Sequence, residues 1–109
     1  MGKFNYPNGA RVEIEDRALA HLQIVITNKL RRGESFLFSW RDDASVGHGR
    51  TAVWLNPALA LSFKFNGSRT PTLNRTWTEA LAITANSPGG LYLVPEPAEA
   101  ESRDSVEPI

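Results

Sequence analysis

Several cations and one tryptophan recur at alternate positions in the middle of the sequence, in segments predicted to be strands. Arg41, Arg50, Trp54 and Lys64 all fall on the side opposite the large apolar residues of their segments. Guanidinium and ammonium groups bind phosphates, and an aromatic ring stacks on an unpaired base. The pattern therefore predicts a sheet face that binds DNA or RNA through these four side chains.

The same pattern has two other interpretations. An exposed tryptophan on a flat sheet face is a common anchor of protein interfaces. Trp54, with Leu37, is therefore also a candidate contact for a protein partner or for a second copy of the chain. The third interpretation is an ordinary solvated face, because the predicted domain is less basic than a dedicated nucleic-acid-binding domain.

A second group of cations, Lys29, Arg31 and Arg32, lies near the end of a predicted helix. These residues would extend the predicted nucleic-acid-binding track beyond the sheet. Cations in the last turn of a helix also stabilise the helix through its dipole, whatever else they bind. The structural interpretation is favoured, and the binding interpretation stays open.

The loop between the first two strands of this region combines glycines with polar side chains. Gly47, His48 and Gly49 are predicted to cradle an anion with their backbone N–H groups. Asp42, Asp43 and His48 are of the types that bind metals, but their spacing matches no calcium or zinc pattern. The loop is therefore a candidate anion site, turn geometry alone also explains its glycines, and we predict no metal site.

The usual signatures of catalysis are absent from the sequence. There is no cysteine, no G-x-S-x-G elbow and no glycine-rich phosphate loop. The two histidines, His21 and His48, fall in a predicted helix and a predicted loop, and no Ser-His-Asp set can be assembled around them. The sequence therefore favours a small non-enzymatic binding module without a cofactor.

Hydropathy patterns indicate how the chain positions these residues. Asn-Gly between alternating segments predicts a hairpin, and apolar residues at helical spacing predict two helices. The predicted elements are strands at 3–6 and 10–14, a helix at 16–32, strands at 35–41, 50–56 and 59–66, a helix at 73–87 and a short strand at 91–94. Asp16 and Asn74 are the expected helix caps. This order, ββαβββαβ, predicts an α+β two-layer sandwich, in which two helices cover one face of an antiparallel sheet whose three middle strands form a meander.

Charge divides the 109-residue chain into two parts. Residues 1–94 have eleven basic and seven acidic side chains, whereas residues 95–109 have one basic and five acidic. We predict a single domain at 1–95 and a disordered acidic tail at 96–109 that competes for the basic face. Since no apolar run is long enough to span a membrane, we expect a cytoplasmic protein with no membrane partner.

Segments throughout the domain resemble small actinobacterial proteins of similar length. They are DRALAHLQ at 16–23, NKLRRGESF at 28–36, SWRDD at 39–43, WLNP at 54–57, LNRTWTEAL at 73–81 and ANSPGGL at 85–91. The family is described as a domain of unknown function, and its members are often labelled ATP-dependent DNA ligase. The resemblance therefore implies a link to DNA metabolism, with nucleotidyl transfer as a remote alternative function.

Lys64 is the residue on which the ligase label can be tested. An ATP-dependent ligase carries AMP on the lysine of a K-x-D-G motif, and the nearest match here is KFNG at 64–67. Asn66 stands where the motif has an aspartate, and a neutral amide cannot supply the negative charge of that position. Lys64 is thus a remote catalytic candidate, and the sequence favours a strand end before an Asn-Gly turn.

Overall fold

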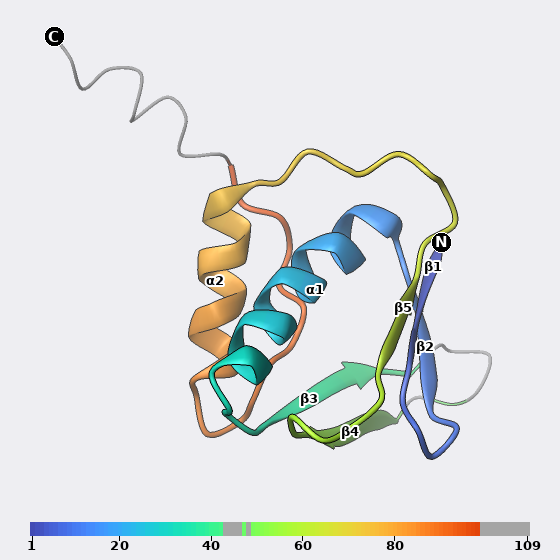
Figure 1. Cartoon of the computed structure of the whole chain (residues 1–109). Coiled ribbons are helices and arrows are strands. Elements are labelled where there is room, and N and C mark those ends of the chain that lie inside the picture. Colours follow the sequence, from blue (N-terminus) through green and yellow to red (C-terminus); the bar gives the residue numbers. More distant parts are fainter. Residues whose placement is uncertain (43–46, 48, 99–109) are drawn as a thin grey trace, which may run out of the picture.

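The computed structural model of the chain describes residues 1–42, 47 and 49–98. In this part of the chain the elements are β1 (Gly2–Asn5), β2 (Arg11–Ile14), α1 (Asp16–Arg31), β3 (Phe36–Arg41), β4 (Arg50–Leu55), β5 (Ser62–Lys64) and α2 (Arg75–Ala85). Figure 1 shows the two helices on one side of the β3–β4 pair, with β1, β2 and β5 at its flank. The predicted α+β class and element order are confirmed.

The strands form two antiparallel sheets instead of one. One sheet has the order β2-β1-β5, and the other contains β3 and β4. The predicted meander is therefore wrong at its third strand, because β5 pairs with β1 and not with β4. The reason is a long-range contact. Phe63 lies directly opposite Phe4 with ring centroids 5.4 Å apart, and Phe4 in turn packs on Phe38 of the other sheet at 5.1 Å.

The first hairpin forms as predicted. The side chain of Asn8 accepts a hydrogen bond from the backbone N–H of Ala10 at 2.8 Å, and Gly9 has a φ of 96°, which favours glycine. The backbone N–H of Tyr6 donates to the carbonyl of Ala10 and closes the turn.

Helix α1 begins where predicted but is capped differently. The residue before the helix is Glu15, whose side chain makes no capping hydrogen bond. Asp16 accepts hydrogen bonds from the backbone N–H groups of Asn66 and Gly67 instead, at 3.1 and 2.9 Å. These bonds lower the pKa of Asp16. The expected capping role of Asp16 is therefore wrong, and its carboxylate ties α1 to the turn after β5.

Helix α2 is shorter than the predicted 73–87, but its cap is correct. The side chain of Asn74 accepts from the backbone N–H of Trp77 at 3.3 Å. Trp77 and Leu81 are buried against the rest of the core. Leu73 falls within the predicted helix but is exposed, because it precedes the helix that forms.

A C-terminal segment, residues 91–97, runs back along α2 and is called the strap below. Leu91 bridges Phe38 in parallel, through hydrogen bonds to the backbone of Leu37 and Ser39 at 2.7 and 3.0 Å. Of the strand predicted at 91–94, the structure has only this bridge at Leu91. The strap continues towards the start of α2, and Figure 1 shows it running beside this helix.

Candidate nucleic-acid interface

Two arginines lie directly opposite each other at one end of the β3–β4 pair. Arg41 and Arg50 are cross-strand partners, and both are exposed. In the described part of the chain, no residue forms a hydrogen bond or an ion pair with either guanidinium group. Like charges directly opposite each other destabilise a sheet, by roughly 0.2–1 kcal/mol on the scale of cross-strand pairs. A bound anion would remove this repulsion.

Trp54 lies on the same face of β4 as Arg50, four residues further along the strand. The strand rise separates the two positions by roughly 13 Å. Trp54 is 54% exposed and stands opposite Leu37. Its backbone carbonyl accepts a hydrogen bond from the hydroxyl of Tyr6 at 2.5 Å, which ties this end of β4 to the first hairpin.

The four residues predicted to share one sheet face lie in two different sheets. Strand alternation puts Ser39 on the same side of β3 as Arg41, but Ser39 is only 4% exposed because the strap bridges β3 beside it. Lys64 is exposed, but it lies in the other sheet, opposite Lys3. Arg41, Arg50 and Trp54 therefore share one face, and Lys64 belongs to a different sheet.

Lys29 cannot contribute to the predicted track because it is 6% exposed. Its ammonium group donates to Glu34 at 2.8 Å and to Asn86 at 2.7 Å. The bonds from Lys29, and then from Arg32, lower the pKa of Glu34. Lys29 is thus an internal ion-pair partner that joins the ends of the two helices. Of the three cations, Arg32 contacts Glu34 at 3.3 Å and Arg31 is exposed at the helix end.

The predicted anion loop falls largely outside the described residues. Gly47 and Gly49 are described and are exposed. Asp43 and His48 lie outside the described residues. Asp42 accepts a hydrogen bond from the hydroxyl of Thr51 at 2.8 Å. Among the residues that are described, no three histidine or acidic side chains gather as metal ligands would.

A groove of about 980 Å³ opens beside the arginine pair. Its floor contains core residues of α1, β3 and α2, including Leu22, Phe38 and Trp77. Its rim is formed by the exposed edge of β2, the end of β3–β4 and the strap. The rim residues are Val12, Glu13, Glu15, Trp40, Arg41, Arg50, Tyr92, Leu93, Pro95 and Glu96. The sequence patterns missed this groove because segments far apart in the sequence build it.

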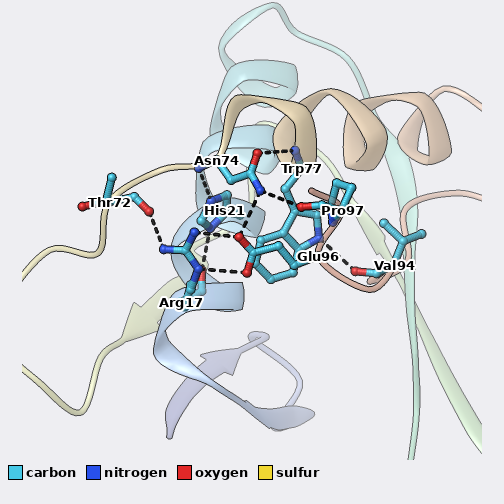
Figure 2. A network of polar contacts seen from close by, with 8 residues as sticks. All are labelled: Arg17, His21, Thr72, Asn74, Trp77, Val94, Glu96 and Pro97. Atoms are coloured by element: carbon cyan, nitrogen blue, oxygen red, sulfur yellow. Dashed lines mark hydrogen bonds and ion pairs between the residues drawn. The ribbon is translucent and has the colours of Figure 1, made fainter. Parts of the chain in front are cut away.

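A clasp holds the strap against the helices and so fixes one wall of the groove (Figure 2). Arg17 donates two hydrogen bonds to the carboxylate of Glu96, at 2.9 and 2.6 Å. Asn74 donates a third from its side chain at 3.0 Å. The Arg17 guanidinium, followed by the Asn74 amide, lowers the pKa of Glu96 to about 2. Glu96 and Pro97, the first residues of the predicted tail, are therefore held on the domain.

Asn74 is the centre of the clasp, as Figure 2 shows. Its backbone N–H donates to Nε2 of the fully buried His21 at 2.7 Å, and its side chain also donates to the carbonyl of Pro97 at 3.0 Å. Since Nε2 of His21 is an acceptor, its Nδ1 carries the proton and donates to the carbonyl of Arg17 at 2.7 Å. The indole of Trp77 donates to the carbonyl of Val94 at 2.9 Å. A cap, a histidine and a carboxylate thus form one connected network.

Comparison with known protein families gives one match. A family model described as a domain of unknown function, DUF7882, covers residues 1–96. The chain belongs to this family. The DUF7882 match includes residues 91–96 of the strap, so all of the clasp except Pro97 lies within the family domain. No curated protein and no solved structure matches the chain.

The DUF7882 description names no activity, so function has to be argued from the site. Lys64, the residue to which a ligase role would fall, does not line the groove. The backbone N–H groups of the turn that follows it are bonded to Asp16. Within the described residues, no helix is long and apolar enough to cross a membrane.

Proposed function

We propose that this domain is a non-enzymatic module that binds single-stranded DNA or RNA across the face formed by Arg41, Arg50 and Trp54. The observation that carries the proposal is the arginine pair, whose two positive charges face each other without a described partner. Such a pair lowers stability in the free protein. Binding of phosphates would turn the same pair into a favourable site.

Trp54 supplies the second element of the proposed interface. An exposed aromatic ring contributes about 1–3 kcal/mol when a base stacks on it. Its position, on the same face as Arg50 and roughly 13 Å away, matches a strand that passes from a phosphate contact to a stacked base. Stacking on a flat face requires an unpaired base, which favours single-stranded nucleic acid.

The acidic end of the sequence gives the proposal a regulatory component. Residues 99–109 have four acidic side chains and one basic, so they would compete with phosphates for the arginine pair. Glu96 and Pro97 belong to the clasp, and their removal would disturb the domain. The informative truncation therefore ends at Ala98, because it keeps the clasp and removes residues 99–109.

The test is fluorescence anisotropy with labelled single-stranded DNA and RNA of roughly ten nucleotides, within the range of sites that bind without sequence preference. We expect Arg41→Gln to weaken binding at least about fivefold, which corresponds to the loss of about 1 kcal/mol, and Trp54→Ala to do the same. Arg69→Gln serves as the matched control. It removes the same charge from an exposed position in the segment before α2, which lies on the other side of the helices in Figure 1.

Protein stability separates a loss of binding from a loss of fold. Because Arg41→Gln removes a like-charge contact, the variant should unfold at the same or a slightly higher urea concentration than the wild type. Weaker binding by a protein that is equally stable supports the proposal. Equal binding by Arg41→Gln, Trp54→Ala and the wild type contradicts it.

A second candidate function is self-association or protein binding through Trp54 and Leu37. These two side chains are cross-strand partners, and Trp54 is half-exposed. Such a residue is a suitable interface anchor. Size-exclusion chromatography with light scattering tests the homo-oligomer. A larger mass for the wild type than for Trp54→Ala supports it, and a monomer in both cases excludes it.

A further inference from the structure

The groove beside the arginine pair combines three chemical features on separate walls. Arg41 and Arg50 line it from β3 and β4, and two carboxylates, Glu13 and Glu15, line it from β2 and from the residue before α1. Aromatic surface comes from Trp40 and Tyr92, of which Tyr92 is 49% exposed. Its volume, about 980 Å³, lies near the upper end of the range of small-molecule sites.

The charged groups that line the groove differ in whether they already have a partner within the protein. Glu96 also lines the groove, but its carboxylate is already bonded to Arg17 and Asn74. The side-chain carboxylates of Glu13 and Glu15 make no hydrogen bond or ion pair with any residue in the described part of the chain. Among the described residues, the groove therefore offers two guanidinium groups and two carboxylates that make no hydrogen bond or ion pair there, a set that suits a ligand with both an anionic group and hydrogen-bond donors.

We infer that the groove binds one nucleoside monophosphate unit whose base has an exocyclic amino group. The phosphate would contact Arg41 and Arg50, and the base would lie against Trp40 or Tyr92. A carboxylate of Glu13 or Glu15 would accept a hydrogen bond from the amino group, as glutamate accepts one from N4 of cytosine. This inference rests on the proposed function, because a strand bound across β3–β4 reaches the groove at the same arginines.

The arrangement predicts selectivity between two pyrimidines of the same shape. Cytosine has an amino group at C4, whereas uracil has a carbonyl oxygen there. A carboxylate accepts a hydrogen bond from the amino group of cytosine and repels the carbonyl oxygen of uracil. A correct hydrogen-bonded pair discriminates between bases by about 1–3 kcal/mol, so we expect cytidine monophosphate to bind roughly 5- to 150-fold more tightly than uridine monophosphate.

The test is isothermal titration calorimetry of the full chain with cytidine 5′-monophosphate, uridine 5′-monophosphate, cytidine and inorganic phosphate. We expect cytidine monophosphate to bind most tightly, and cytidine and phosphate each to bind at least about tenfold more weakly. In the double variant Glu13→Gln/Glu15→Gln, the preference for cytidine monophosphate should fall towards unity, because glutamine can also donate to a carbonyl. The control is Glu79→Gln, an exposed carboxylate of α2 outside the groove.

The outcomes separate this inference from the proposed function. If labelled oligonucleotides bind and neither monophosphate binds or competes, the groove inference is wrong and the proposed function stands. If the two monophosphates bind equally, the carboxylate contact is wrong. If cytidine monophosphate binds with the expected selectivity and no oligonucleotide binds, the groove site stands and the extended interface is wrong.

Discussion

Gly90 directly precedes the strap, and its substitution tests how the groove wall is positioned. The backbone of Gly90 has a φ of 84°, a region that L side chains rarely adopt. A Cβ atom added there would lie 2.5 Å from the carbonyl oxygen of Leu37 and 2.7 Å from its Cβ. Both atoms belong to β3 and cannot move away without disturbing the bridge at Leu91. Gly90→Ala should therefore displace the strap or destabilise the domain.

Two other glycines separate the contributions to this effect. Gly33 has a φ of 78° but no atom within 4 Å of an added Cβ, so Gly33→Ala measures the backbone strain alone. That strain is about 1–2 kcal/mol. Gly89 has neither a positive φ nor a close neighbour, and Gly89→Ala should change stability little. Overlap in a packed region adds about 1–3 kcal/mol, so Gly90→Ala should cost about 2–5 kcal/mol in all.

Urea unfolding followed by tryptophan fluorescence measures the series. The expected order of stability is Gly89→Ala, close to the wild type, then Gly33→Ala, then Gly90→Ala. A drop of about 2 kcal/mol corresponds to a fall in melting temperature of roughly 8–16 °C for a domain of this size. The argument about the strap is refuted if Gly90→Ala is no less stable than Gly33→Ala.

Three further predictions concern the polar contacts. The pKa of Glu96 is lowered from 4.5 to about 2, so its contact with Arg17 should stabilise the fold above about pH 4.5 and lose this effect as the pH falls towards 2. The urea midpoints of the wild type and Glu96→Gln should therefore converge at acid pH. A difference that stays constant with pH would contradict this. Lys29→Met should lower the free energy of unfolding by about 1–3 kcal/mol, because it removes buried charge-assisted hydrogen bonds. Arg31→Gln should change thermal unfolding little. Equal effects of the two variants would mean that the buried ion pair does not stabilise the fold. Asn74→Ala should cost about 1–2 kcal/mol through its cap alone, and a change below about 0.5 kcal/mol in urea unfolding would show that the clasp does not depend on it.

Local patterns predicted the elements well because short-range geometry determines them. The burial of Phe36 and Phe38 and the exposure of Trp54 agree with the alternation in the sequence, since side chains alternate between the two faces of a strand. The partner of β5 could not be found in this way. Alternation fixes which side of a strand is apolar, but the choice of β1 over β4 depends on the packing of Phe63 against Phe4.

The candidate site was predictable in part for the same reason. Arg41, Arg50 and Trp54 were placed on one face by alternation alone, and the register of β3 and β4 agrees. Lys29 was misassigned although a signal was present, because it follows Leu22 and Ile26 at helical spacing and so lies on the buried side of α1. No local signal could have found the contact between Glu96 and Arg17, which are 79 residues apart.

The salt dependence of nucleic-acid binding tests most directly the claim that Arg41 and Arg50 contact phosphates. Each phosphate contact with a single strand contributes about 0.7 to the slope of log K against log salt concentration. The double variant Arg41→Gln/Arg50→Gln should therefore bind more weakly than the wild type, and its slope should be smaller by about 1.4. The control Arg69→Gln/Arg75→Gln, with the same net charge, should keep the slope of the wild type. An unchanged slope in the Arg41/Arg50 variant, or the same change in both variants, would contradict a specific interface at this face.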